Sequence, residues 1–194
     1  MIFYSLECRW FLSGTMPGPL LDRLNRSGHN YQTEERRDYY LHQPDIKQTG
    51  IKMREGQAEY KIRVHNERSF QTDHYSGQLQ YFKKWSFDLQ RSHKVLSDRF
   101  REQPEWIPVD KKRWLSDIAY KKSRCSLEFS NLQIGDSTWW SICFEQAVKN
   151  QPEPEKLVEL IKANNVLQAL SPNMLARSNS MSYPEHLSQI IADR

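Results

Sequence analysis

The N-terminal segment of the chain alternates between apolar and polar residues with a period of two. From residue 2 to residue 12 the even positions are apolar, whereas the odd positions include Ser5, Glu7 and Arg9. Successive side chains of a β-strand point to opposite faces, so the pattern predicts a strand with one apolar and one polar face. The apolar face consists of Ile2, Tyr4, Leu6, Cys8, Trp10 and Leu12.

The same two-residue period recurs along the chain and limits the fold class. Including the first segment, it predicts about eight strands, and turn-forming residues such as Glu55-Gly56-Gln57 separate neighbouring ones. Strands and helices do not alternate as a parallel sheet requires, so we expect a mainly β (α+β) fold, an antiparallel barrel or sandwich. The other predicted strands are residues 37–41, 50–54, 59–64, 79–87, 109–114, 125–129 and 139–146.

Helical periodicity is confined to three short stretches. Leucines at helical spacing within residues 20–24 predict a first helix. A second run opens at Pro152 and Pro154 and carries apolar residues at a 3.6-residue period as far as Leu167. A last helix is expected over residues 184–191, so helices are peripheral to the predicted β-structure.

The connecting segments complete the predicted organisation. Residues 65–77 are polar and are expected to form a loop, and residues 88–104 show no consistent period beyond a possible helical turn. We expect one domain over residues 1–194, with a β-part at 1–146 and a helical part at 151–194 that packs on it.

The excess of positive charge in the chain lies in the predicted β-part. The 194 residues carry a net charge of +4, and 27% of them are charged. After Ala147 five basic and five acidic residues cancel, so the whole excess lies before that point. A moderate excess is compatible with anionic ligands, but it falls short of a nucleic-acid-binding tail.

The cysteines and the N-terminal residues indicate the cellular compartment in which the protein is expected. The three cysteines, Cys8, Cys125 and Cys143, have no metal-ligand spacing, which predicts reduced thiols in a cytoplasmic protein. Glu7 and Arg9 interrupt the stretch that a signal peptide needs to be apolar. No apolar run approaches the ~20 residues of a membrane span, so we expect no membrane association.

The polar faces of the predicted strands have two interpretations. Exposed charged faces are the usual case, so these side chains could be solvated exterior residues. They could instead line a wide barrel, because bulky groups such as Trp10 and Trp85 on the apolar faces would overfill a small closed interior. Arg and Lys that converge from several strands would hold phosphate oxygens. The predicted anion-binding residues are Arg9, Lys52, Arg54, Lys61, Arg63, Lys84, Lys111 and Arg113.

A few carboxylates are interspersed among these basic residues. Carboxylate oxygens bind Mg²⁺ or Mn²⁺, and such ions bridge phosphate groups. The predicted metal ligands are Glu7, Glu59, Glu128 and Glu145.

The order of these segments resembles the CYTH superfamily, also called triphosphate tunnel metalloenzymes, which includes class IV adenylyl cyclases, thiamine triphosphatases and inorganic triphosphatases. Ser5-Leu6-Glu7-Cys8-Arg9 is similar to the Glu-x-Glu-x-Lys start of that family. A turn at Pro44-Asp45 precedes the alternating basic strand Lys52-Met53-Arg54, and the tail Ser180-Met181-Ser182-Tyr183 is similar to the Ser-Lys-Tyr-type ending of many relatives.

The resemblance implies an eight-stranded antiparallel tunnel that binds a triphosphate, with a metal held by the glutamates of the first strand. This chain departs from the family pattern at Ser5, and Ser141 and Cys143 also stand where further glutamates would be expected. A serine contributes no charge, so metal affinity should fall. Anion binding is therefore better supported than metal-dependent hydrolysis.

Three functional hypotheses follow from the sequence. The first is a divalent-metal-dependent phosphohydrolase that acts on a triphosphate or an inorganic polyphosphate. The second is a non-catalytic protein that binds a phosphorylated metabolite or another anion with the same basic residues. The third is a single-stranded nucleic-acid binder that uses basic residues interleaved with aromatic ones. Aromatic residues on apolar strand faces are more typical of core packing, which disfavours the third hypothesis.

Overall fold

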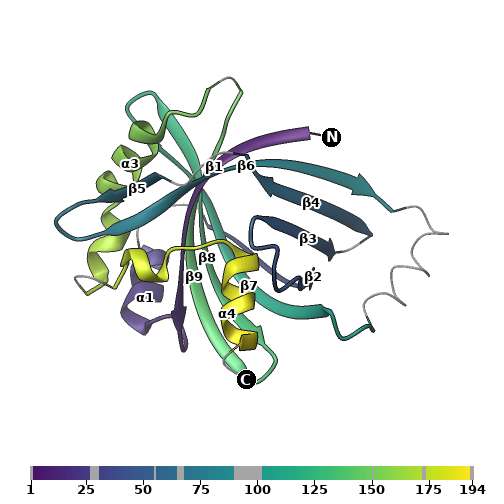
Figure 1. The fold of residues 1–194 in the computed structure, drawn as a ribbon. Helices are drawn as coiled ribbons and strands as arrows, with labels where there is room; N and C mark the ends of the chain where they lie inside the picture. The colour runs from purple at the N-terminus through teal and green to yellow at the C-terminus, as the bar shows by residue number, and fades with distance from the viewer. Residues whose placement is uncertain are drawn as a thin grey trace.

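The protein forms a closed antiparallel β-barrel. The computed structural model describes residues 2–26, 31–54, 56–64, 68–89, 102–149, 151–171 and 174–192. Eight strands follow the order β1-β9-β8-β7-β2-β3-β4-β6, and pairing between β1 and β6 closes the ring, which confirms the predicted eight-stranded barrel (Figure 1). The barrel strands are β1 (Ile2–Ser13), β2 (Gln32–Leu41), β3 (Thr49–Arg54), β4 (Gln57–Arg63), β6 (Ser76–Asp88), β7 (Trp106–Tyr120), β8 (Ser123–Ile134) and β9 (Ser137–Ala147).

The junction between β1 and β6 is regular along only part of β1. The two strands pair antiparallel from the Ile2–Trp85 partners to the Glu7–Gln80 partners. Beyond Glu7, residues 174–182, here called the C-terminal strap, run along the freed edge of β1. Ser180 forms an isolated bridge with Trp10, and the Met181 backbone N–H donates to the Arg9 carbonyl at 3.1 Å.

The strap is also tied to β6. The Ser76 N–H donates to the Leu175 carbonyl at 2.9 Å, and the Gln78 N–H donates to the Ser180 hydroxyl at 2.9 Å. The strap contains the short 3₁₀ helix η2 (Arg177–Asn179) and leads into helix α4 (Tyr183–Ala192). A segment from the C-terminal end of the chain therefore completes the barrel wall.

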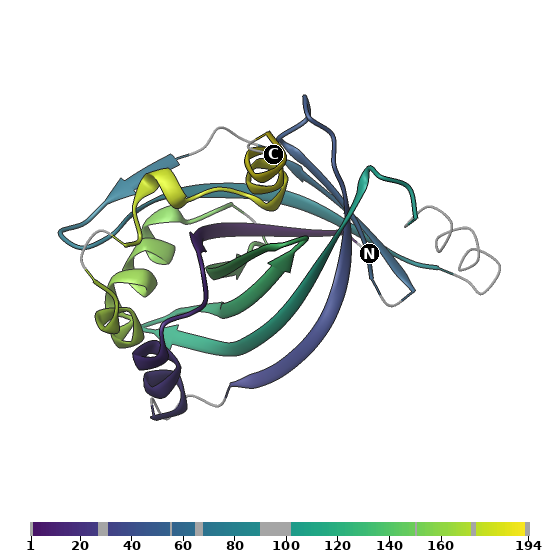
Figure 2. The same cartoon turned by 90° about the horizontal axis from the view of Figure 1, so that it is seen from below.

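The main hydrophobic core lies outside the barrel, between the strands and the helices. Figures 1 and 2 show α1 (Gly18–Arg26) and α3 (Pro154–Ala163) on one side of the barrel and α4 apart from them. Leu6, Cys8 and Trp10 of β1 are buried in this outer core, together with apolar residues of β8, β9, α1, α3 and the 3₁₀ helix η1 (Asn165–Ala169). The apolar strand faces thus point away from the barrel axis, and all three cysteines are buried free thiols.

A second hydrophobic cluster lies beneath α4. Apolar residues of β1, β2, β7 and β8 meet the apolar face of that helix. Phe11 of β1 stacks on His186 with a ring-centroid distance of 3.9 Å. The buried members of the cluster are Phe11, Tyr40, Val109, Leu132, Ile134, Met181, Leu187 and Ile190.

The predicted loop over residues 65–77 is wrong in part, because it contains the ninth strand, β5 (Arg68–Gln71), which pairs with β6. The Phe70 ring packs edge-on against Trp10 at a centroid distance of 6.3 Å, and a Cβ at Gly77 would lie 2.8 Å from the same indole. Trp10 lies far from residues 65–77 in the sequence, so the pattern of those residues alone could not indicate that a strand packs against its indole. The other irregular stretch covers residues 88–104, and residues 90–101 of it lie outside the described residues.

The three predicted helices are confirmed as α1, α3 and α4, with one difference at the end of α3. The run expected to reach Leu167 breaks at Asn164, whose backbone is extended and whose side chain accepts from the Val166 N–H, so Leu167 belongs to η1. No helix in the described part of the chain has the length and apolar character to cross a membrane.

Candidate functional site

The polar faces of the barrel strands converge on an internal cavity of about 210 Å³. All predicted site residues except Arg63 line it, together with Arg36, Tyr40 and Tyr183, which sequence reasoning did not select. Eight basic side chains and four carboxylates contribute to the lining. The Arg63 guanidinium instead pairs with Glu185 of α4 at 2.7 Å.

Glu7 of β1 and Glu145 of β9 are cross-strand partners in the cavity wall. Both Glu7 oxygens accept from the Lys61 ammonium at 2.5 Å, and the Ser5 hydroxyl donates to Glu7 at 2.7 Å. Burial by itself would raise the pKa of Glu7, but Lys61, Arg9 and the Ser5 hydroxyl together outweigh burial and lower it. The charge of Glu7 and burial both raise the pKa of Glu145. The two carboxyls therefore differ in their preference for a proton.

Glu128 of β8 lies between two guanidinium groups. Arg9 pairs with its Oε1 atom at 2.8 Å, and the Arg113 Nε donates to its Oε2 atom at 2.9 Å. The Ser130 hydroxyl donates to the same carboxylate at 3.0 Å. Burial opposes ionisation, but the cations Arg9 and Arg113 hold the pKa of Glu128 well below its usual range.

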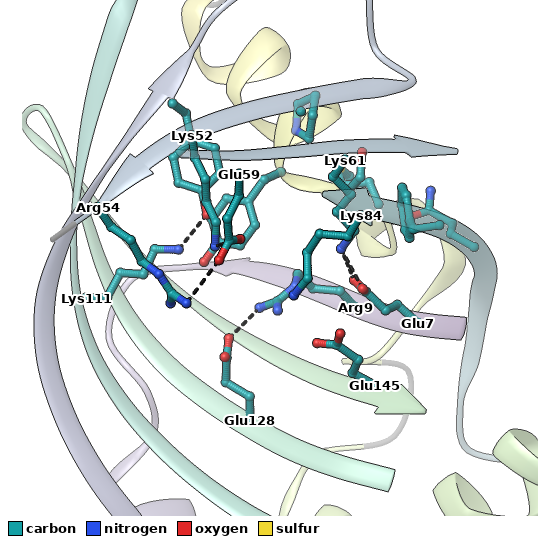
Figure 3. Close-up of a pocket in the computed structure, with 18 of the residues that line it drawn as sticks. Glu7, Arg9, Lys52, Arg54, Glu59, Lys61, Lys84, Lys111, Glu128 and Glu145 are labelled. Carbon is teal, nitrogen blue, oxygen red and sulfur yellow. Dashed lines mark hydrogen bonds and ion pairs between the residues drawn. The ribbon is translucent and has the colours of Figure 1, made fainter. Parts of the chain in front are cut away.

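A third group of charges surrounds Asp38 of β2 and Glu59 of β4. Lys111 pairs with Asp38 at 2.8 Å, and Lys52 pairs with Glu59 at 2.8 Å while its ammonium lies 4.0 Å from Asp38. Arg54 completes the group by pairing with Glu59 at 3.0 Å. Burial lowers the pKa of Lys52 and of Lys111 to about 8, although neighbouring carboxylates oppose the shift. Figure 3 shows Lys52 and Arg54 of this group facing Glu59.

The signal for the residues missed on β2 was present in the sequence. Glu34, Arg36, Asp38 and Tyr40 alternate with residues of the opposite face, as the neighbouring strands do. We predicted this strand only from residue 37, whereas β2 begins at Gln32, so the first half of the alternation was overlooked. Arg36 pairs with the fully buried Asp38 at 3.1 Å, which makes Asp38 a counter-ion for three cations.

Lys84 of β6 differs from the other cavity lysines. No carboxylate lies within ion-pairing distance of its ammonium among the residues that the structure describes, and the ammonium is 5.8 Å from the ring centroid of Phe3. Figure 3 shows its side chain reaching toward Arg9. Lys83, the preceding residue, lies on the outer face, where its ammonium is 4.8 Å from the Trp85 ring centroid.

The four predicted metal ligands do not gather into one cluster. Glu59 and Glu128 are each held by two cations, and Glu7 is held by Lys61. Among the described residues no group of three or more His, Cys, Asp or Glu side chains is arranged to hold a metal ion. The expectation of Mg²⁺ or Mn²⁺ therefore stays a prediction, and we derive no reaction step from such an ion.

Comparison with known proteins identifies the fold but not a family. No family model matches the sequence, and no curated protein matches it. Among solved structures, the PH1012 protein from Pyrococcus horikoshii OT3 is similar, with a TM-score of 0.51 and 16% identity over 92% of this chain and 98% of that one. HpAC1 from Hippeastrum, described as a candidate adenylyl cyclase with a dominant triphosphatase activity, has a TM-score of 0.47 and 12% identity over 86% of each chain. At 16% identity the likeness to the PH1012 protein concerns the fold alone.

Proposed function

We propose that the cavity binds a compact, multiply charged anion made of phosphoryl groups. A triphosphate, a short inorganic polyphosphate or a phosphorylated metabolite meets this description. The observation that carries the proposal is the convergence of eight basic side chains and four carboxylates on one cavity. Forked guanidinium donors and ammonium point charges are the groups with which proteins hold phosphate oxygens.

The size of the cavity favours a small ligand. Pockets that enclose drug-sized molecules usually measure about 300–1,000 Å³, whereas this cavity measures about 210 Å³. A chain of two or three phosphoryl groups is therefore a better candidate than a whole nucleotide enclosed in the barrel.

The internal ion pairs prepare the cavity for such a ligand. Carboxylates such as Glu128 and Glu59 keep the basic side chains ordered while the cavity contains no anion. A bound polyanion would then share these cations with the carboxylates, at little cost in side-chain ordering. Lys84, which has no such carboxylate among the described residues, would be available to the ligand without competition.

Hydrolysis of the bound anion is the finer hypothesis. It would require a divalent cation, and the neighbouring carboxyls of Glu7 and Glu145 are the place where one would bind together with phosphate oxygens. Release of inorganic phosphate from tripolyphosphate, measured with and without Mg²⁺ or Mn²⁺, separates this hypothesis from a non-catalytic binder. Loss of that release in the Glu7→Ala variant would support hydrolysis.

Adjacent lysines on β6 offer a matched test of anion binding. We expect Lys84→Gln to weaken the affinity for tripolyphosphate about tenfold, because one charged hydrogen bond is lost. Lys83→Gln removes the same charge from the outer face and should change the affinity less than twofold. Isothermal titration calorimetry measures both. No binding to the wild-type protein, or equal effects of the two substitutions, would exclude the cavity as the binding site.

A further inference from the structure

Tyr183 brings an aromatic ring into the cavity from outside the barrel. It is the first residue of α4 and follows the C-terminal strap, yet it lines the cavity together with strand residues. The ring stacks on Tyr40 of β2, with a centroid distance of 4.8 Å and an interplanar angle of 15°. The edge of Phe11 packs against it with a centroid distance of 4.9 Å. Its place is thus determined by contacts with two strands.

Two of the cavity cations lie over this one ring. The Lys111 ammonium is 4.0 Å from the ring centroid of Tyr183, and the Arg9 guanidinium carbon is 5.0 Å from it. Both separations are within the range of a cation–π attraction, in which a cation is drawn to the negative face of an aromatic ring. Such contacts are strongest in sites from which water is excluded.

The two cations need this support because they repel one another. Burial is the main cause of the lowered pKa of Lys111, and the positive charge of Arg9 lowers it further. Asp38 and Glu128 offset part of the repulsion from their own sides of the cavity. An aromatic ring within reach of both cations adds attraction without adding a carboxylate that would repel an anionic ligand.

We propose that Tyr183 is a positioning residue for the anion site, whose ring holds Lys111 and Arg9 directed into the cavity. The inference rests on the proposed anion binding and extends it to a residue outside the barrel strands. The ring, rather than the hydroxyl, performs this role.

The surroundings of Tyr183 make the ring separable from the hydroxyl and from the helix. The hydroxyl oxygen is buried and has no hydrogen-bond partner among the described residues, so its removal breaks no bond. The helix start is held independently by Glu185, which accepts from the Ser182 backbone N–H at 2.7 Å and from the Gln80 amide at 3.0 Å. When the ring is changed, Glu185 therefore continues to anchor the start of α4.

The experiment varies the electron density of the ring at constant shape. We expect Tyr183→Phe to retain the affinity for tripolyphosphate within twofold. Replacement of that phenylalanine by its mono-, di- and trifluorinated forms should then weaken binding stepwise, because fluorine withdraws electron density from the ring face. Tyr183→Leu, which removes the ring, should weaken binding about tenfold. Calorimetry measures the affinities, and thermal unfolding shows whether each variant is folded.

His186→Leu is the matched control. His186 lies on the same helix and packs on Phe11 and Trp139, but it does not line the cavity. Burial lowers the pKa of His186 to about 3, so the substitution removes no charge at neutral pH. We expect it to leave the affinity for tripolyphosphate unchanged within twofold.

A ligand-free measurement tests the position of the ring directly. The ε-methylene resonances of Lys111 should carry a ring-current shift that persists in Tyr183→Phe. In Tyr183→Leu the shift should fall to the part that Tyr40 contributes, whose ring centroid is 4.8 Å from the Lys111 ammonium. Full affinity in folded Tyr183→Leu, or affinity that does not respond to fluorination, would overturn the role of Tyr183 and leave anion binding standing. A wild-type protein that binds no tripolyphosphate would overturn the proposed function, and the positioning role with it.

Discussion

The interior of the barrel consists of two halves that the same strands build in different ways. The polar half is the cavity with its ion pairs, and the apolar half is the cluster beneath α4. On β1 the change occurs between Arg9 and Phe11, and on β7 it occurs between Lys111 and Val109. One step of the strand period, two residues, thus separates a charged site from a hydrophobic core.

The two halves differ in what they contribute to stability. Apolar side chains that meet under α4 stabilise the fold by leaving water. Buried ion pairs add little net stability compared with apolar residues of the same volume, because each charge must first be desolvated. The apolar half and the outer core therefore contribute most of the stability of the barrel that surrounds the polar half.

The largest expected effect is the loss of a carboxylate in the polar half. Glu128→Ala leaves Arg9 and Arg113 without the carboxylate they share, so the free energy of unfolding should fall by about 3–5 kcal/mol. Urea unfolding measures the change. Tripolyphosphate should stabilise this variant more than the wild-type protein, since it supplies the missing negative charge. Equal stabilisation of both proteins would show that the ligand does not contact these arginines.

A substitution in the apolar half should affect stability alone. Leu187 of α4 is 1% exposed, and Leu187→Ala should lower the free energy of unfolding by about 3 kcal/mol through the lost burial and the cavity left behind. The affinity for tripolyphosphate, measured where the variant is fully folded, should remain within twofold of the wild-type value. A large loss of affinity would mean that the two halves are not independent.

The smallest expected effect is a pH dependence that belongs to the polar half. Burial lowers the pKa of Lys52 and of Lys111 to about 8, below the 10.4 of a free lysine, so both lose their protons as the pH rises through 8. The affinity for sulfate, whose own charge is constant in this range, should fall severalfold between pH 7 and pH 9. Leu187→Ala should show the same profile, and Lys52→Met a flatter one. An affinity that is constant up to pH 10 would contradict the lowered pKa values.

The same pair of lysines affects stability with the opposite sign. Their pKa is lower in the folded protein, so between pH 8 and 10.4 the unfolded chain binds more protons. Their contribution to the free energy of unfolding therefore rises with pH in this window. Anion affinity and this part of the stability should thus change in opposite directions as the pH increases.

Part of the site was predictable because strand alternation is a local property. Glu7 and Arg9, or Lys52 and Arg54, share a face whatever the rest of the chain does. Arg63 was assigned to the cavity by the same rule and instead pairs with Glu185, because that residue of α4 lies beside this end of β4. Tyr183 could not be found by alternation, because it reaches the cavity from a helix.

By itself, the sequence determined which side chains lie together on each strand face, since the two-residue period follows from the geometry of the extended backbone. Only the tertiary structure decided that the charged faces point inward. That choice depends on closure of the ring by β1 and β6 and on the coverage of the apolar faces by α1 and α3. The tertiary structure also decided which charged side chains pair: Arg9 and Glu128 form an ion pair although 119 positions separate them in the sequence. A contact of that range is formed by the fold as a whole, and no local pattern encodes it.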